Sequence, residues 1–146
     1  PEIVLAGRRV NDGMGAYVAN QLYEAMVRKD IKMDGARVLI LGLTFKENCK
    51  DIRNTGVIDI INELSGYGIQ VDVYDPWVDA DEARSEYGID VLEIPMTDSY
   101  DGIIAAVSHD QFREYGASWV RGFGRSVHAF YDLKHMFLPE ESDLRL

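Results

Sequence analysis

The stretch ARVLILGL at residues 36–43 decides the fold class. It is a short apolar run, rich in branched side chains, that lies between the turn residues Asp34 and Gly35 and a polar loop. Such a run predicts a strand buried on both faces, as in a parallel sheet, because a strand with one solvent-exposed face alternates apolar and polar residues. The sequence therefore indicates an α/β domain.

Further strands and helices alternate along the chain on either side of this run. Strands are predicted at 36–43, 69–74, 91–92, 101–107 and 127–131, and helices at 11–29, 56–65, 79–87 and 110–115. We expect Asn54 or Thr55 to cap the second helix, and the acidic tail at 139–146 to be loosely held. The alternation predicts a Rossmann-like, doubly wound parallel sheet of about five strands, preceded by a long amphipathic helix.

That first helix, at 11–29, presents apolar side chains at three- and four-residue steps. Asn11 or Asp12 is expected to cap its start. Gly13 and Gly15 lie in its first turn, where the missing side chains leave room for another backbone to approach.

Three loops are expected to meet at one edge of the sheet, because the carboxyl ends of parallel strands lie together. These loops are 44–55, 108–111 and 132–135. Ligands of open α/β sheets bind at that edge, so the candidate site is placed there.

The loop TFKENCKDIRNT at 44–55 is the most informative of the three. It leads into a helix N-terminus, which favours an anion, and Lys46, Lys50 and Arg53 add positive charge. It contains neither a Walker motif nor a G-x-G-x-x-G fingerprint. An anion site and a solvated connector with scattered charges therefore both remain open.

Other chemically capable residues have simpler interpretations. Asp75 ends a predicted strand and can contact a ribose, but a turn with the following proline is favoured. Cys49 has basic neighbours that would activate a thiol, but no His-plus-acid partner set is evident. A structural role is favoured for His109, His128 and His135, of which only His109 lies at the ligand edge, and their spacing does not form a metal site.

Composition narrows the function classes. The 146 residues suit one domain, and 47% hydrophobic against 27% charged residues is typical of a globular protein. The net charge of −10 argues against nucleic-acid binding, and no apolar run reaches the ~18 residues of a membrane span. A single cysteine fits a reducing compartment, so a cytoplasmic location is expected. Since the chain starts at Pro1, we expect a fragment of a longer protein.

The charge is unevenly distributed. Residues 1–55 hold 9 basic and 7 acidic side chains, a balance of +2, whereas residues 56–146 hold 6 and 18, a balance of −12. An anionic ligand would therefore have to be met by local positive charge in the first third of the chain.

Several short motifs occur together in a characteristic order. They are GRRVND at 7–12, LGLTFK at 41–46, DIR at 51–53, VYDP at 73–76, AVSHDQF at 106–112 and YDLK at 131–134. With these motifs the chain resembles the C-terminal domain of the UDP-glucose/GDP-mannose dehydrogenase family. It is most similar to the branch, of the Vi-antigen type, that oxidises UDP-N-acetyl-hexosamines for surface polysaccharides.

The resemblance implies an NAD-dependent enzyme that oxidises the sugar C6 alcohol to a carboxylate with two NAD. An N-terminal domain would bind NAD, and a middle region would carry the catalytic cysteine. Neither the NAD fingerprint nor that cysteine segment is present, so Cys49 is not assigned the role of the catalytic cysteine. No catalytic residue and no metal are expected here, and this fragment is expected to be inactive alone. The implied division is a connecting helix at 1–30 and a nucleotide-sugar-binding domain at 31–146.

The resemblance also implies roles for individual residues. Lys46 and Lys134 would contact the UDP-N-acetyl-hexosamine, although many family members have arginine at the position of Lys134. Arg53 would reach the NAD pyrophosphate across a cleft formed with the protein's own N-terminal domain. The helix at 11–29 would form a homodimer or a higher homo-oligomer.

Two interpretations from other classes stay open at this point. The chain can be a stand-alone Rossmann-like module that binds an anion or nucleotide through the loop at 44–55. It can also be an interaction domain that uses its acidic face.

Overall fold

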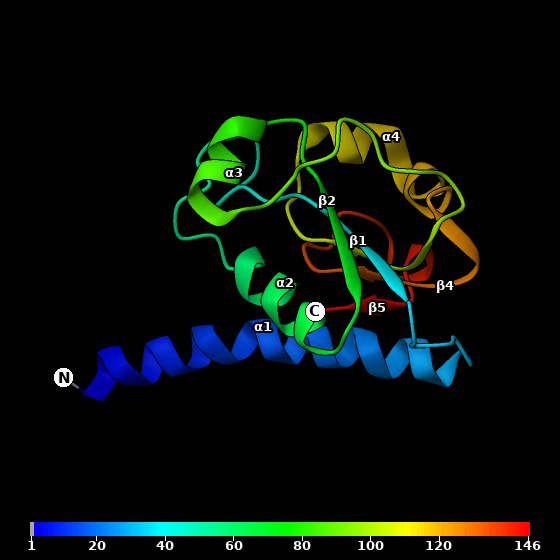
Figure 1. Cartoon of the computed structure of the whole chain (residues 1–146), viewed down its shortest axis with the longest axis horizontal. Coiled ribbons are helices and arrows are strands. Elements are labelled where there is room, and N and C mark those ends of the chain that lie inside the picture. Colours follow the sequence, from blue (N-terminus) through cyan, green and yellow to red (C-terminus); the bar gives the residue numbers. More distant parts are fainter. Residues whose placement is uncertain (1) are drawn as a thin grey trace.

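The computed structural model describes the backbone of residues 2–146 and the side chains of residues 13–146. The chain forms one parallel sheet with helices on both sides, and the long first helix runs beneath it (Figure 1). The elements are α1 (Glu2–Arg28), β1 (Arg37–Leu41), α2 (Val57–Gly66), β2 (Gln70–Tyr74), α3 (Ala80–Tyr87), β3 (Tyr100–Ala105), α4 (Asp110–Arg121), β4 (Gly124–Asp132), the 3-10 turn η1 (Pro139–Glu141) and β5 (Leu144–Arg145).

The strand order is β2-β1-β3-β4-β5, and every neighbouring pair is parallel. Val38 of β1 lies between Val71 of β2 and Gly102 of β3. After β1 the chain moves to β2 on one side, and then crosses to β3 on the other. The connections therefore diverge between β1 and β3, which is where open α/β sheets bind their ligands. The predicted doubly wound parallel sheet is confirmed.

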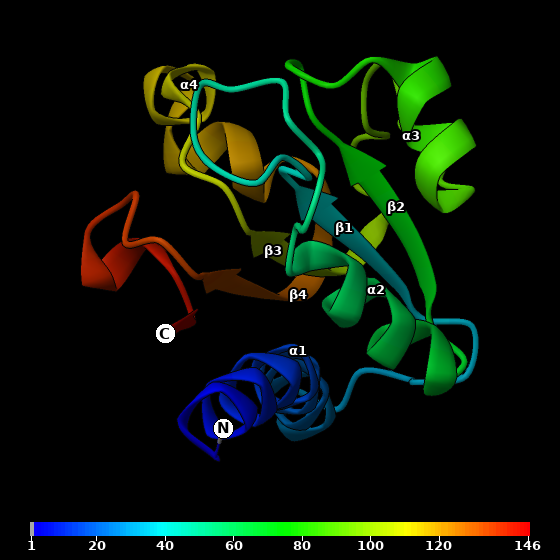
Figure 2. The same ribbon diagram turned by 90° about the vertical axis from the view of Figure 1, so that its left-hand side faces the viewer.

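Strand β1 is buried on both faces, as its composition predicts. Val38 and Ile40 belong to the hydrophobic cluster that includes α1 and α2, whereas Leu39 and Leu41 belong to the cluster that includes α4. Successive side chains of a strand point to opposite faces, so both layers are needed to bury this run. Figure 2 shows α1 and α2 below the sheet and α4 above it.

The second half of α1 is part of the main core. Val18, Ala19, Leu22 and Met26 are at most 1% exposed and pack with side chains of the sheet and of α2. At Gly15 an added Cβ would lie 2.5 Å from the Cβ of Asp59, so α1 and α2 approach each other closely there. The expected close approach is therefore confirmed at Gly15. The division of the chain at residue 30 stays a prediction.

The helix ends differ from those expected. Helix α1 begins at Glu2, so Asn11 and Asp12 lie inside it and cannot cap its start. Polar residues of this kind are tolerated inside a helix at a modest cost, which makes them ambiguous start signals. Helix α4 consists of two helical segments that meet at Gly116, whose φ of 87° is not helical. The first segment agrees with the helix expected at 110–115, and the second, which ends at Arg121, was not predicted.

The cap of α2 is also shifted by one residue from the prediction. Gly56 occupies the N-cap position without a side-chain cap. The Thr55 hydroxyl instead accepts a hydrogen bond from the Val57 N–H at 3.3 Å. Thr55 thus stabilises the first turn of the helix from just outside it.

The strands near the end of the chain were only partly predicted. The expected strand at 91–92 is an isolated bridge between Val91 and Val73, and β4 begins earlier, at Gly124. The expectation of a loosely held tail is wrong, because β5 extends the sheet beside β4. A two-residue strand carries no periodicity of its own, so only its long-range pairing reveals it.

Asp143 holds this tail against the sheet. Its carboxylate accepts hydrogen bonds from the Arg121 guanidinium and from the Phe130 N–H, each at 2.8 Å. Burial acts to raise the pKa of Asp143, but these hydrogen bonds and the nearby charges of Arg121 and Lys29 keep that pKa below its ordinary value.

The close approach of α1 and α2 predicts opposite effects for two neighbouring glycines. Gly15→Ala should lower the free energy of unfolding by about 1–3 kcal/mol, because the new methyl group overlaps Asp59. Gly13→Ala should raise it by about 0.5–1 kcal/mol, because the position is open and alanine favours the helix. Urea unfolding of the purified chain measures both. Equal effects of the two substitutions would contradict the packing described.

Candidate functional site

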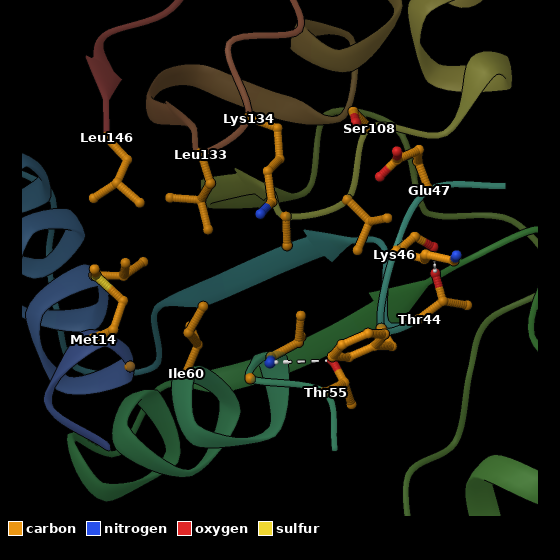
Figure 3. Close-up of a pocket in the computed structure, with 17 residues that line it drawn as sticks. Met14, Thr44, Lys46, Glu47, Thr55, Ile60, Ser108, Leu133, Lys134 and Leu146 are labelled. Atoms are coloured by element: carbon orange, nitrogen blue, oxygen red, sulfur yellow. Dashed lines mark hydrogen bonds between the residues drawn. The ribbon is translucent and has the colours of Figure 1, made fainter. Parts of the chain in front are cut away.

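A pocket of about 260 Å³ lies at the carboxyl edge of the sheet, at the point where the connections diverge. Its lining comes from α1, the loop after β1, the first turns of α2, the segments after β3 and β4, and the final residue. Figure 3 shows these segments around the space. Two of the three predicted ligand-edge loops contribute several residues, and Ser108 represents the third.

The inner part of the pocket is apolar. Val18, Val57, Ile60 and Val107 line it and are buried in the core. The exposed lysines Lys46 and Lys134 also line the pocket, along with a few other polar groups. Apolar walls with a small number of charged groups are typical of small-molecule sites.

Lys46 and Lys134 lie on different sides of this pocket. In Figure 3, Lys134 extends from the segment after β4 into the space, whereas Lys46 lies at the opposite rim beside Thr44. The N-terminus of α2 also lines the pocket, through Gly56 and Val57. The two ammonium groups outnumber the one acidic side chain of the lining, Glu47, and together with the positive end of a helix dipole they favour an anionic ligand at this place.

Gly42 allows the loops after β1 and β3 to meet behind the pocket. Its φ is +102°, and an added Cβ would lie 2.6 Å from the Cβ of Val107. Only glycine satisfies both the positive φ and the close approach. The loop after β1 therefore begins in close contact with the segment after β3, whose Val107 lines the pocket.

Asp75 connects the ends of β1 and β2. Its side chain is fully buried, and its Oδ2 accepts hydrogen bonds from Leu43 N at 2.7 Å and Thr44 N at 3.2 Å. Its Oδ1 accepts one from Trp77 N at 2.8 Å, which confirms the predicted turn. Both oxygens are thus occupied inside the protein, and Asp75 does not present a carboxylate to a ribose.

His109 links the loop after β3 to the ends of β1 and β2, which Asp75 connects. The side chain is fully buried, and its Nδ1 accepts a hydrogen bond from Asn48 N at 3.0 Å. Since Nδ1 accepts, the ring proton is on Nε2, which donates to Asp75 Oδ2 at 2.9 Å. The structural role favoured for His109 is confirmed, although it joins loops of the ligand edge and not a distant part of the core.

The other two histidines also have structural roles. His128 donates from Nδ1 to the carbonyl of Arg125 at 2.7 Å and accepts at Nε2 from the Arg121 guanidinium at 3.2 Å. His135 contacts the carbonyl oxygen of Leu146. Within the side chains of residues 13–146, no group of three metal-ligating residues is close enough to hold an ion.

Arg53 lies outside the pocket, on the far part of the same loop. Its side chain is 78% exposed and forms a two-pronged ion pair with Asp51, with both N–O distances at 3.0 Å. This hydrogen bonding lowers the pKa of Asp51 and raises the pKa of Arg53. The pocket thus brings Lys46 together with Lys134, while Lys50, Arg53 and Cys49 are separate from its lining.

Two contributions to the pocket were missed by reasoning from the sequence. One is the wall formed by Met14, Gly15 and Val18 of α1, and the other is Leu146 at the end of the chain. The sequence signal for the wall formed by α1 was Gly15, a glycine within a helical pattern. No local pattern points to the second, because it depends on the pairing of β5 with β4.

No helix in the described part of the chain has the length and apolar character that a bilayer crossing requires.

Comparison with known proteins finds a matching family and similar proteins. The sequence model of the UDP-glucose/GDP-mannose dehydrogenase family, UDP binding domain, matches residues 39–139. The UDP-N-acetyl-D-glucosamine 6-dehydrogenase of Pseudomonas aeruginosa is 58% identical over all 146 residues, and that of Salmonella typhi is 55% identical over the same length. These alignments cover 35% and 34% of the two relatives, so the chain spans about a third of their length.

The fold comparison agrees with the sequence comparison. The crystal structure of an NDP-N-acetyl-D-galactosaminuronic acid dehydrogenase from Methanosarcina mazei Go1 superimposes with a TM-score of 0.80 and 26% identity. The match covers 94% of this chain and 28% of that one.

Of the three interpretations left open by the sequence, these matches favour the enzyme domain, and the resemblance stated from its motifs is confirmed. The chain belongs to the UDP-glucose/GDP-mannose dehydrogenase family, and residues 39–139 correspond to that family's UDP binding domain.

Proposed function

We propose that this chain supplies the nucleotide-sugar-binding side of an NAD-dependent UDP-sugar 6-dehydrogenase. The observation that carries the proposal is the pocket at the carboxyl edge of the sheet, with Lys46 and Lys134 on opposite sides and the N-terminus of α2 in its lining. A diphosphate is the part of a UDP-sugar that such an arrangement favours, because lysines and helix N-termini both attract phosphate oxygens.

The substrate we propose is a UDP-N-acetyl-hexosamine. The support is the 58% and 55% identity, over the whole chain, to two proteins named UDP-N-acetyl-D-glucosamine 6-dehydrogenase. The apolar inner surface formed by Val57, Ile60 and Val107 suits the faces of rings, which carry little charge. Binding through these groups would hold the substrate in the ground state and the transition state alike, and would therefore act on KM.

The oxidation of an alcohol to a carboxylate removes four electrons, so two equivalents of NAD are needed as hydride acceptor. We propose that Arg53 contacts the pyrophosphate of NAD. Its exposed guanidinium fits this role, because it extends outside the UDP pocket and its planar fork can bind a phosphate with two hydrogen bonds. The carboxylate of Asp51 holds the fork in one orientation.

We assign the chemical step to a part of the enzyme beyond this chain. The relatives are about three times longer than the chain, which supports an N-terminal NAD domain and a catalytic cysteine in the remainder. The chain alone is proposed to be inactive, with residues 1–30 as the connecting helix and residues 31–146 as the binding domain.

Helix α1 is proposed to meet a second subunit in a homodimer or a higher homo-oligomer. The support is that Met14, Tyr17 and Val27 are large apolar side chains of α1 that lie 43–51% exposed, on a helix whose other face is in the core. The free thiol of Cys49 is compatible with a reducing compartment, and we propose the cytoplasm.

The first test is UDP binding by the full-length enzyme, measured by calorimetry. Lys46→Ala and Lys134→Ala should each weaken UDP binding by about tenfold, since each removes one charge-assisted contact to phosphate. Lys134→Arg should retain most of the affinity, because the guanidinium keeps the charge and can also bind phosphate.

Lys50→Ala is the matched control for this test. Lys50 is an exposed lysine of the same loop, but it is not part of the pocket lining. It should leave UDP binding unchanged within about twofold. Equal losses for Lys50→Ala and Lys46→Ala would contradict the proposed site, as would full affinity in both pocket variants.

The second test concerns NAD. Arg53→Ala should raise the KM for NAD by about tenfold and leave the KM for the UDP-sugar unchanged, because only the pyrophosphate contact is removed. Arg84→Ala is the control, since Arg84 is also exposed and paired with an aspartate, Asp90. An unchanged KM for NAD in the Arg53 variant would refute its assigned role.

A further inference from the structure

The loop that carries Lys46 is anchored by one buried imidazole. His109 contacts the loop on both sides of Lys46, because its Nδ1 accepts from Asn48 N at 3.0 Å and its Nε2 lies 3.3 Å from the Thr44 hydroxyl. The Thr44 hydroxyl in turn donates to the carbonyl oxygen of Lys46 itself, at 2.8 Å. The backbone of Lys46 is thus held within a short chain of hydrogen bonds that ends at His109.

Asp75 determines which ring nitrogen of His109 carries the proton, and therefore which nitrogen can accept a hydrogen bond from this loop. Its buried Oδ2 accepts from His109 Nε2 and also from the backbone N–H groups of Leu43 and Thr44. A carboxylate in this position requires a donor at Nε2 and leaves Nδ1 free to accept from Asn48. The same oxygen therefore orients the ring and fixes the start of the loop.

The loop is also joined to the start of α4, which His109 precedes. The Asn48 side chain accepts from Asp110 N at 3.0 Å, next to the contact between Asn48 N and His109. Asn48 has a φ of +54°, a left-handed conformation that needs support from its surroundings. These contacts supply that support, and none of the three residues that make them lines the pocket.

We propose that His109, oriented by Asp75, is a positioning residue for nucleotide-sugar binding, which it serves by fixing the loop that presents Lys46 to the UDP pocket. The inference rests on the proposed function. His109 itself is fully buried and does not line the pocket, so its effect on the ligand must pass through the loop.

The test measures UDP binding and steady-state kinetics of the full-length enzyme with His109→Ala. UDP should bind about tenfold more weakly, and the KM for the UDP-sugar should rise while kcat is retained. The reason is that the weakened contact holds the substrate equally in the ground state and in the transition state. His109→Gln should recover part of the affinity, since an amide can accept from Asn48 and donate to Asp75.

Phe112→Leu is the control for a general loss of stability. Phe112 is fully buried and packs against the ring of His109, with centroids 5.5 Å apart, but it makes no polar contact with the loop. This variant should unfold more easily and bind UDP as the unaltered enzyme does. Weaker UDP binding in Phe112→Leu, equal to that in His109→Ala, would overturn the proposal.

A double-mutant cycle distinguishes this inference from the proposed function. If His109 acts through Lys46, then His109→Ala should have little further effect in a Lys46→Ala background. Fully additive losses would overturn the positioning role while leaving the UDP site intact. An enzyme that does not bind UDP, or binds it independently of Lys46, would overturn the proposed function and this inference with it.

Thr44 provides a second pair of variants in case His109→Ala does not fold. Thr44→Val keeps the shape of the side chain but removes the hydroxyl that contacts His109 and Lys46, whereas Thr44→Ser keeps the hydroxyl. UDP binding should weaken several-fold in the valine variant and be retained in the serine variant. Equal affinity in the two variants would contradict the proposal.

Discussion

The buried contact between Asp75 and His109 joins the loops that follow β1, β2 and β3. Strand pairing alone brings only the strand ends together, and leaves the loops beyond them free to adopt other paths. A buried carboxylate removes that freedom, because it is stable only while its oxygens accept hydrogen bonds. Here four N–H groups satisfy it, so the loops must return to one arrangement. The shape of the neighbouring pocket depends on this constraint.

The local placement of charge explains how an acidic chain can suit an anionic ligand. The net charge is −10, but Lys46 and Lys134 come from segments far apart in the sequence and line the same pocket. The N-terminus of α2 adds a partial positive charge there. Screening limits the reach of the acidic surface to about 8–10 Å at ordinary ionic strength, whereas the lysines contact the pocket directly. Local geometry therefore decides the preference more than total charge does.

The extent to which the structure could be predicted from the sequence depends on how local each signal is. The run at 36–43 predicts a parallel sheet because burial on both faces leaves a continuous apolar pattern in one segment. The helical periodicity of α1 and the glycine at position 15 are equally local. By contrast, β5 and the contribution of Leu146 depend on pairing with β4, and the bonds of Asp75 and His109 depend on the strand order. Lys46 was indicated by the charge of its loop and by the resemblance to a family, and Lys134 by the resemblance alone. Their meeting in one pocket required the fold, which leaves Arg53 outside that pocket.

The protonation of the imidazoles gives the most direct measurement of the central constraint. Nitrogen NMR of protein labelled with ¹⁵N-histidine reports which ring nitrogen carries the proton. His109 should carry it on Nε2, and the proton should exchange slowly with water, because Nδ1 accepts from Asn48 and Nε2 donates to buried Asp75. His128 should show the opposite tautomer, with the proton on Nδ1, because that nitrogen donates to the Arg125 carbonyl. A proton on Nδ1 of His109, or a ring that exchanges freely between tautomers, would contradict this account of how the pocket is held.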